Sequence, residues 1–504
     1  MNNGTAIPPM HYADWLQRHA VTRPNTIAIA TPSHRLTYAG FYRTLHAAAH
    51  RLAEYKIEAG QTVALCVLNQ ALHCVLIAAL NRMGCVPLSL PRPLKADVAI
   101  SLPQGLVVDR ILVEQPFDGT SPAGSVDVDP DWLKTANDEV TEWQQPGLRD
   151  GDATAHIFTS SGTTSAFKAV GFSTRQLEAR IFKRSIGVFG SGRTGKSMCQ
   201  LGLRSQVGFN AVFSTLWVGG TVFLGWPDAA VPALVARNGI ERVEGSPAQY
   251  QATLRGSDPS AFDLSTLRFA IIAGSTTPQP LIAGIKAKLC RVLINLYGTT
   301  EVGPIAFGPL RAGDAPGRCG QIVPWMHAQA VDQDGNPLPA GAEGNLRFRC
   351  EGMATTYLND PQASSDYFRD GWFYPGDIGV VTEQRGLSIS GRSAERINAG
   401  GVKVAPAIVE DVVISYEGVL DCAAFGVPDG MGVDKIWTAI VVDRQINLDG
   451  LRKHCEAQLG ARAPHHFLTL SELPRNEAGK ILRTKLSQLA RESAAAKTNE
   501  KNGA

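Results

Sequence analysis

The chain has 504 residues, of which 44% are hydrophobic and 19% are charged, and its formal net charge is +2. A chain of this length exceeds the size at which one hydrophobic core usually stops growing, so we expect at least two domains. The small net charge argues against nucleic acid or an anionic membrane as the partner.

Cysteine spacing and hydropathy bear on the cellular setting. The nine cysteines show no CxxC or paired spacing, which is typical of reduced thiols and predicts a cytoplasmic protein. Residues 1–30 lack the basic start, apolar run and cleavage motif of a signal peptide. Polar residues, among them Asn69, Gln70 and Arg82, interrupt the most hydrophobic stretch, 62–90. No membrane span is therefore predicted.

Short apolar runs bounded by turn residues alternate with helical patterns over most of the chain. Runs such as 62–68 and 269–273 predict strands. Ser173 with Gln176 predicts a capping box at a helix start, and Ser246 before Pro247 predicts the N-cap of a second helix. This alternation indicates an α/β fold.

The pattern changes towards the C-terminal end. Short strands and turns predict a β-rich subdomain at about 315–391, within a large N-terminal α/β domain over 1–391. The strands and helices that follow predict a small C-terminal α+β domain at 392–490. The tail 491–504 has no apolar periodicity and is expected to be disordered.

The first motif that suggests a chemical function is a run of serine and threonine residues around one glycine. Its residues are Thr159, Ser160, Ser161, Gly162, Thr163 and Thr164, with Lys168 shortly after. Hydroxyls and backbone N–H groups in a turn converge on phosphate oxygens, and a lysine adds a charge that holds pyrophosphate. The alternative is a solvated Ser/Thr loop.

Three further segments matter for the resemblance described below, and one of them also has a chemical interpretation of its own. They are Gly274-Ser275, Tyr297-Gly298-Thr299-Thr300-Glu301 and Gly371-Trp-Phe-Tyr-Pro-Gly-Asp377. A carboxylate beside a hydroxyl-bearing turn is suited to a magnesium ion that bridges phosphates, which makes Glu301 a candidate metal ligand. An exposed loop glutamate is the alternative.

A rival motif, 190–197, matches the P-loop pattern GxxxxGK[ST] in full. It follows a run at 185–189 that is compatible with a strand. Candidate partner aspartates exist, but Asp109 precedes the motif and Asp443 falls in the predicted small domain. A P-loop NTPase that uses Lys196 therefore stays open as an alternative.

Taken in chain order, the motifs resemble those of the adenylate-forming enzymes, which include acyl- and aryl-CoA ligases, luciferases and peptide-synthetase adenylation domains. The resemblance spans 158–486. The run ending at Lys168 resembles TSGTTGxPKG and departs from it at Ser165, Phe167 and Ala169. The resemblance implies a large domain that binds ATP, Mg²⁺ and an acid, and a mobile C-terminal domain.

The resemblance also implies roles for single residues of the large domain. Tyr297 is expected to lie against adenine, Thr300 to contact the α-phosphate and Glu301 to bind Mg²⁺. Asp377 is expected to accept hydrogen bonds from the ribose hydroxyls, and Arg392 to contact ribose or phosphate.

Roles in the C-terminal region follow in the same way. Lys480 resembles the adenylation lysine, which brings together two anions, the substrate carboxylate and the α-phosphate. The hinge is expected at Ala394, where the family commonly has Asp or Lys. Gly400 and Gly401 are expected to let the backbone approach the pantetheine arm of CoA.

The acid is expected to bind against the segment 201–220. By the resemblance its pocket includes Val207, Phe209, Asn210, Phe213 and Gly303. Most side chains of the segment are apolar, which predicts an aliphatic or aromatic acid. No aspartate stands near Asn210 to pair with an α-ammonium group, which argues against an amino acid.

The sequence thus predicts an ATP-dependent carboxylic acid:CoA ligase that forms an acyl-adenylate and then an acyl thioester. Its small-molecule partners are ATP, Mg²⁺, a carboxylic acid and CoA. The phosphopantetheine of a carrier protein could replace CoA as the acceptor. A P-loop NTPase that uses 190–197 and a catalytically silent binding module also stay open as functions. No oligomeric state is predicted.

Overall fold

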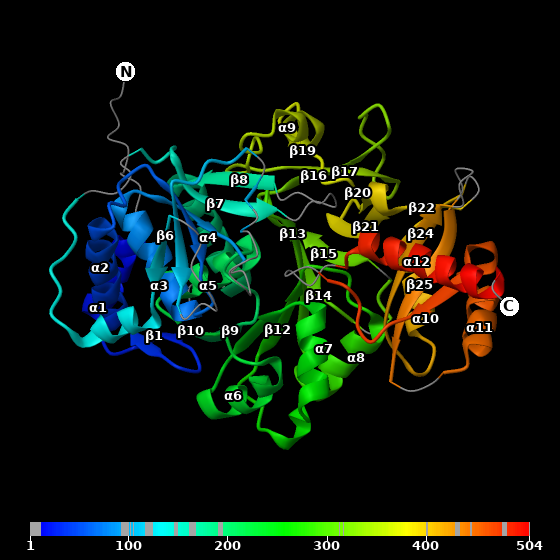
Figure 1. The fold of residues 1–504 in the computed structure, drawn as a ribbon, viewed down its shortest axis with the longest axis horizontal. Helices are drawn as coiled ribbons and strands as arrows, with labels where there is room; N and C mark the ends of the chain where they lie inside the picture. The colour runs from blue at the N-terminus through cyan, green and yellow to red at the C-terminus, as the bar shows by residue number, and fades with distance from the viewer. Residues whose placement is uncertain are drawn as a thin grey trace.

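The computed structural model describes most of the chain between residues 12 and 502. The described residues are 12–91, 100, 102–103, 105–115, 124–145, 150–160, 168–189, 195–311, 313–315, 317–399, 402–428, 434–443, 446–475 and 481–502. Figure 1 shows sheets and helices layered in the larger part of the molecule and a smaller unit at one end, built from the last strands and helices. This is the α/β architecture with a small C-terminal α+β unit that the sequence predicts.

Over the described residues, the first sheet has six strands in the order β6-β5-β3-β4-β7-β8. Their bounds are β3 Thr62–Cys66, β4 Val86–Ser89, β5 Arg110–Glu114, β6 Ser125–Val128, β7 Thr154–Ser160 and β8 Lys168–Ser173. All neighbours are parallel except β7 and β8, which form an antiparallel pair. Ser160 pairs with Lys168 in this hairpin, so the two flanks of residues 161–167 meet.

The second sheet is larger, with the order β18-β19-β17-β20-β21-β15-β14-β13-β12-β11-β9-β10-β1-β2 over the described residues and β16 paired to β17. Its first strands are β1 Ile27–Ala30, β2 Arg35–Thr37, β9 Lys196–Cys199, β10 Thr221–Leu224, β11 Arg242–Gly245, β12 Phe269–Ala273 and β13 Leu293–Thr299. From β1 to β13 through β10, β9, β11 and β12 the neighbours are parallel. Parallel strands place their carboxyl ends at one edge, where ligands of open α/β sheets bind.

Beyond β13 this sheet is antiparallel and forms the β-rich part of the chain. Its strands are β14 Gly303–Pro309, β15 Arg318–Ile322, β16 His327–Val331, β17 Glu343–Arg349, β18 Phe368–Arg369, β19 Trp372–Phe373, β20 Asp377–Val381 and β21 Gly386–Arg392. They share a core of their own, which includes Ile305, Leu346, Phe348 and Phe373. The β-rich subdomain predicted from the sequence is therefore present.

Helices cover both sheets (Figure 1). Their bounds are α1 Tyr12–Thr22, α2 Tyr38–Glu54, α3 Gln70–Met83, α4 Thr174–Phe189, α5 Gln206–Trp217, α6 Val231–Asn238, α7 Pro247–Gly256, α8 Gln279–Lys288 and α9 Pro361–Tyr367. Short 3₁₀ helices lie at η1 Pro130–Asn137, η2 Asp228–Ala230 and η3 Pro259–Ala261. Helices α1, α2, α3 and α5 pack in one core cluster, and α6, α7 and α8 pack in another beneath the parallel strands.

Helix starts follow the capping residues that the sequence predicts. The Ser173 backbone N–H donates to Gln176 Oε1 over 2.9 Å, and the Gln176 N–H donates to Ser173 Oγ over 3.3 Å, so the capping box is formed. Ser246 caps α7 in the same reciprocal way with Gln249. Helix α3 is buried on nearly every side, as expected for a helix inside the large domain rather than in a membrane.

The small C-terminal unit has a two-stranded sheet, β22-β23, and a three-stranded sheet, β24-β25-β26, together with helices. Its strands are β22 Ile397–Ala399, β23 Val402–Val404, β24 Val419–Pro428, β25 Asp434–Val442 and β26 His466–Thr469. Its helices are α10 Pro406–Ile414, α11 Leu448–Leu459 and α12 Arg483–Asn502, with 3₁₀ helices at η4 Ser393–Glu395 and η5 Gly460–Arg462. A separate hydrophobic cluster, including Val409, Ile436 and Leu451, forms its core.

Two expectations about local structure are wrong. The run 185–189 is the last part of helix α4 rather than a strand, because the capping box at Ser173 starts a helix that continues to Phe189. The tail is helical as far as Asn502, since α12 runs through it. The tail is rich in Ala, Lys and Glu, which have high helix propensity, so a helix forms there without an apolar stripe.

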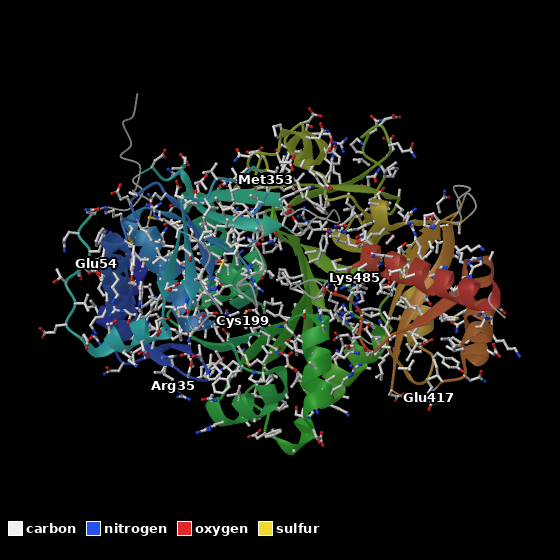
Figure 2. All side chains as sticks on the ribbon, viewed as in Figure 1. Arg35, Glu54, Cys199, Met353, Glu417 and Lys485 are labelled. Carbon is white, nitrogen blue, oxygen red and sulfur yellow. The ribbon has the colours of Figure 1, made fainter. Side chains whose placement is uncertain are left out.

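All nine cysteines are free thiols in the structure, and eight of them are buried. Cys199, for example, lies inside the molecule at the end of β9 (Figure 2). Burial raises the pKa of its thiol. Among the described residues, no helix is both long and apolar enough to span a bilayer.

Candidate active site

A cavity of about 1180 Å³ lies where the two sheets and the small C-terminal unit meet. Twelve of the predicted nucleotide-binding residues line it: Thr159, Ser160, Lys168, Gly274, Ser275, Tyr297, Gly298, Thr299, Thr300, Glu301, Asp377 and Arg392. Three of the predicted acid-binding residues, Val207, Asn210 and Gly303, line it as well. The structure thus brings together motifs that are more than 200 residues apart in the sequence.

Several predicted residues lie outside the described residues. They are Ser161, Gly162, Thr163, Thr164, Gly400, Gly401 and Lys480. The neighbours of two of these groups do line the cavity: Ser160 and Lys168 flank the group from Ser161 to Thr164. Arg475 and Ile481, which form a β-bridge with each other, flank the segment that contains Lys480 and also line the cavity. Ala394, the predicted hinge residue, lies in η4.

Asp377 is held between a phenol and a guanidinium. The Tyr297 hydroxyl donates to Asp377 Oδ2, and Arg392 Nε lies 3.1 Å from Asp377 Oδ1. Burial, together with the neighbouring Asp377 carboxylate, raises the pKa of Tyr297 well above its usual value, so this phenol stays a donor. Asp377 is 4% exposed, so the two partners fix a buried carboxylate at the cavity wall. Such a fixed acceptor suits two adjacent hydroxyl groups.

Glu301 is a second buried carboxylate, and it lies beside aromatic rings. The Tyr357 hydroxyl donates to Glu301 Oε1 over 2.7 Å. Lys168 Nζ lies 3.7 Å from the centre of the Tyr367 ring and 5.0 Å from that of Tyr357. Sequence reasoning missed both tyrosines, because neither belongs to a motif with a recognisable spacing. They position the carboxylate and the lysine through hydrogen bonding and cation–π contact.

The residues around Glu301 fit a magnesium ion. Among the described residues, no group of three or more His, Cys, Asp or Glu side chains could hold a metal. Mg²⁺ at a nucleotide is commonly held by one or two carboxylates, while phosphate oxygens and water complete its shell. A single fixed carboxylate such as Glu301, next to the hydroxyls of Thr299 and Thr300 in the cavity wall, meets that requirement.

Arg180 fixes the loop that carries Thr300 and Glu301. Its Nη1 donates to the Thr300 carbonyl over 3.0 Å and its Nη2 to the Glu301 carbonyl over 2.6 Å, while Nε donates to the Gly352 carbonyl over 3.4 Å. Burial lowers the pKa of this guanidinium to about 10, so it is still charged at neutral pH. It also lies 3.9 Å from the centre of the Phe172 ring. The sequence gives no motif for this positioning role.

Helix α5 meets the cavity with a face that differs from the predicted one. Gln206, Val207 and Asn210 line the cavity. Phe209 and Phe213 are fully buried and stack on each other, with ring centres 4.3 Å apart in the core, so their placement in the pocket wall is wrong. The helix is buried along most of its length, and its composition therefore does not reveal which face adjoins a cavity.

The described residues of the rival P-loop motif, 195–197, do not have the arrangement of a phosphate site. Lys196 and Ser197 begin strand β9 instead of a helix, and the preceding segment is helix α4 instead of a strand. Lys196 Nζ donates to the Asn238 carbonyl over 2.7 Å, and Ser197 Oγ lies 3.0 Å from Thr215 Oγ1. In a P-loop the lysine and serine lie at a helix start and face phosphate. The NTPase alternative is therefore wrong.

We expect Lys196→Ala to leave ATP-dependent activity within about twofold of the wild type, because this lysine donates to the Asn238 carbonyl at the end of α6 and does not line the cavity. The measurement is carboxylate-dependent pyrophosphate release at saturating and at low ATP. A rise of tenfold or more in the KM for ATP would contradict this expectation and would indicate that the motif at 190–197 binds phosphate.

Comparison with known proteins agrees with this geometry. The model of the AMP-binding enzyme family matches residues 16–358, and that of the AMP-binding enzyme C-terminal domain matches residues 408–480. The chain belongs to the AMP-binding enzyme family. A curated relative, the 4-chlorobenzoate–CoA ligase of Arthrobacter sp, is 28% identical over 507 aligned residues, which cover 95% of each chain.

Two solved structures with the same fold contain an acyl-adenylate or ATP with magnesium. The anthranilate CoA ligase AuaEII, in complex with anthranoyl-AMP, has a TM-score of 0.82 at 22% identity and covers 98% of this chain and 100% of its own. The O-succinylbenzoate coenzyme A synthetase MenE from Bacillus subtilis, in complex with ATP and a magnesium ion, has a TM-score of 0.80 at 21% identity, with 95% and 99% covered. At these identities the likeness establishes the fold of this AMP-binding enzyme.

Proposed function

We propose that this AMP-binding enzyme is an ATP-dependent carboxylic acid:CoA ligase. The observation that carries the proposal is the pair of fixed carboxylates, Asp377 with Tyr297 and Glu301 with Tyr357, in one cavity. One carboxylate suits ribose hydroxyls, and the other suits a phosphate-bound Mg²⁺. The cavity also has a wall from the small unit, where Arg475 flanks the segment of Lys480.

The reaction has two steps. A carboxylate oxygen of the acid attacks the α-phosphorus of ATP, and pyrophosphate leaves. The CoA thiolate then attacks the acyl carbon, and AMP leaves. In the first step Lys480 offsets the repulsion between the two anions and the charge that grows on the transferring phosphate, while Thr300 contacts that phosphate. Lys168, with Thr163 and Thr164, holds the departing pyrophosphate.

We propose an aromatic acid as the substrate class. The relative and the solved structures named above are called ligases of 4-chlorobenzoate, anthranilate and O-succinylbenzoate. The acid is expected to bind against Val207, Asn210 and Gly303, which adjoin the nucleotide residues in the cavity. This placement brings its carboxylate next to Thr300.

The proposed small domain, 392–490, rotates about Ala394 between the two steps. Its present position is held by Gln251 Nε2, which donates to the Leu420 carbonyl over 2.7 Å. Since Ala394 has no charge, we propose that its neighbour Glu395, bound by Arg483 over 2.9 Å, takes part in holding the hinge. Gly400 and Gly401 are proposed to adjoin the pantetheine arm. The nine free thiols support a cytoplasmic setting.

The test is pyrophosphate release over a panel of aromatic, aliphatic and dicarboxylic acids, with and without CoA. We expect acid-dependent release of pyrophosphate, and an acyl-CoA product only when CoA is present. Phosphate release in place of pyrophosphate, or no acid dependence, would refute the proposal and would favour a silent binding module. A thiol-competition assay against a phosphopantetheinylated carrier protein separates the two acceptors.

Asp377→Asn is expected to raise the KM for ATP by about tenfold or more, because the amide loses the charge that strengthens hydrogen bonds to ribose and leaves Arg392 without its ion pair. The measurement is the initial rate against ATP concentration at saturating acid. Asp366→Asn, an exposed residue outside the cavity, serves as the control and should leave the KM unchanged.

A further inference from the structure

The cavity wall contains three deeply buried polar side chains that have unused hydrogen-bonding atoms. Arg184 and Asn210 are each 1% exposed, and Gln206 is 5% exposed. Within the described part of the chain, Arg184 Nε, Gln206 Nε2 and Asn210 Oδ1 have no hydrogen-bond partner. All three residues line the cavity. Buried polar atoms are nearly always paired, so a group of them at a cavity wall points to a bound ligand.

These side chains lie on two adjacent helices. Arg180 and Arg184 are four residues apart on α4, and Gln206 and Asn210 are four residues apart on α5, so each pair shares a helix face. A Cβ atom at Gly303 would lie 3.4 Å from Arg180 Nη1 and 4.0 Å from Gln206 Nε2. Gln206 is therefore close to the loop of the proposed reaction centre. Arg184 lies one helical turn after Arg180 on α4, and Asn210 lies one helical turn after Gln206 on α5.

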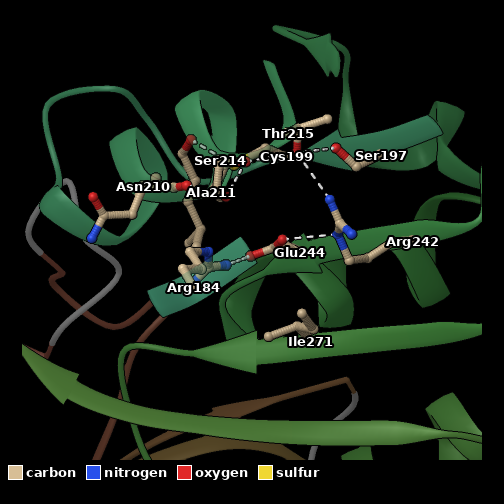
Figure 3. A network of polar contacts seen from close by, with 12 residues as sticks. Arg184, Ser197, Cys199, Asn210, Ala211, Ser214, Thr215, Arg242, Glu244 and Ile271 are labelled. Carbon is tan, nitrogen blue, oxygen red and sulfur yellow. Dashed lines mark hydrogen bonds and ion pairs between the residues drawn. The ribbon is translucent and has the colours of Figure 1, made fainter. Parts of the chain in front are cut away.

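Arg184 is held rigidly by a buried ionic network (Figure 3). Its Nη2 pairs with Glu244 Oε2, and Glu244 Oε1 lies 3.1 Å from Arg242 Nε. Arg242 Nη2 in turn donates to Thr215 Oγ1 over 2.9 Å. Glu244 is shared by Arg184 and Arg242, so Arg184 is not an isolated cation, and the network holds its guanidinium in place as a hydrogen-bond donor at the cavity wall.

We propose that the acid substrate carries, at the end remote from its reacting carboxylate, a neutral group that both accepts and donates hydrogen bonds, of which a hydroxyl is the simplest. The inference rests on the proposed function and specifies its substrate. A hydroxyl accepts from Arg184 Nε and donates to Asn210 Oδ1, which uses two of the three unpaired atoms. A second carboxylate cannot donate to Asn210 and would lie near Glu244. An unsubstituted ring or chain would leave Arg184 Nε and Asn210 Oδ1 unpaired, which costs free energy.

The test compares matched acids that differ at one position. Benzoate, 4-hydroxybenzoate and terephthalate form one series, and hexanoate, 6-hydroxyhexanoate and adipate form another. We expect kcat/KM for pyrophosphate release to be at least about tenfold higher for the hydroxy acid than for the unsubstituted acid in one series, because a site built to bind a hydroxyl rejects the analogue that lacks it. Equal values in both series, or a preference for the dicarboxylate, would overturn the inference.

Variants show whether the preference for a hydroxy acid comes from the cavity wall that contains Arg184, Gln206 and Asn210. Asn210→Leu removes the acceptor and should bring the ratio of kcat/KM between hydroxy and unsubstituted acid to within about threefold of one, with the KM for ATP unchanged. Ser214→Ala is the matched control, since Ser214 is buried one turn further along α5 and does not line the cavity. It should keep the wild-type ratio. A ratio that persists in Asn210→Leu, with a wild-type melting temperature, would contradict the assignment.

The result also separates this inference from the proposed function. If no acid of either series or of the wider panel supports pyrophosphate release, the ligase proposal itself fails. If unsubstituted acids and hydroxy acids support pyrophosphate release equally, the ligase proposal stands. Only the proposal that Arg184 and Asn210 bind a hydroxyl group then fails.

Discussion

Lys480→Ala is expected to slow formation of the acyl-adenylate by at least about a hundredfold, while transfer from supplied acyl-adenylate to CoA stays within about threefold of the wild type. The lysine is proposed to act only where the carboxylate meets the α-phosphate, and loss of one such charge-stabilising donor costs a factor of a hundred or more. The two half-reactions are measured separately, by pyrophosphate exchange and by thioester formation from synthetic acyl-AMP.

Lys485→Ala is the control for this experiment. Lys485 has the same side chain, lies five residues further along the chain at the exposed surface of α12 and does not line the cavity (Figure 2). It should leave both half-reactions unchanged. An equal loss of both half-reactions in Lys480→Ala would refute the assigned role, because a general structural defect affects both steps.

Glu244→Gln is expected to lower the free energy of unfolding of the large domain by about 3–5 kcal/mol, since removing one partner of a buried ion pair leaves uncompensated charge behind. Glu244 is 1% exposed and meets both Arg184 and Arg242. Burial lowers the pKa of the Arg242 guanidinium to about 10, which still leaves it charged at neutral pH. The measurement is urea denaturation followed by tryptophan fluorescence.

Glu241→Gln provides the comparison for stability. Glu241 is in the same segment, but its side chain is 41% exposed and lies 3.9 Å from Arg268. Exposed pairs of this kind contribute about 0–1 kcal/mol. Similar losses in the two variants would show that the buried network does not stabilise the domain in the way its geometry indicates.

The sequence predicts those parts of the fold that depend on local chemistry. Capping at Ser173 and Ser246 depends on neighbouring residues, and both caps form as expected. The segment from Tyr297 to Glu301 has a specific spacing, and its residues do line one cavity with Asp377. Such motifs can be recognised because each carries its chemistry within a few residues.

Features that depend on distant parts of the chain could not be predicted from the sequence. Phe209 and Asn210 are adjacent, yet one lies in the core and the other at the cavity, because the packing of α4 and α5 decides which face adjoins the cavity. Arg184 meets Glu244 from 60 residues away. Tyr357 meets Glu301 across 56 residues, and no spacing rule connects them.

The cavity joins two separately hydrogen-bonded sheets. Thr159, Ser160 and Lys168 come from the six-stranded sheet, while Tyr297 and Asp377 come from the larger one. A ligand that contacts both groups stabilises both sheets, because the unfolding of either sheet releases the ligand. ATP should therefore raise the melting temperature of each sheet. It should also bring the two melting temperatures closer together, so that the two sheets unfold more nearly at the same time.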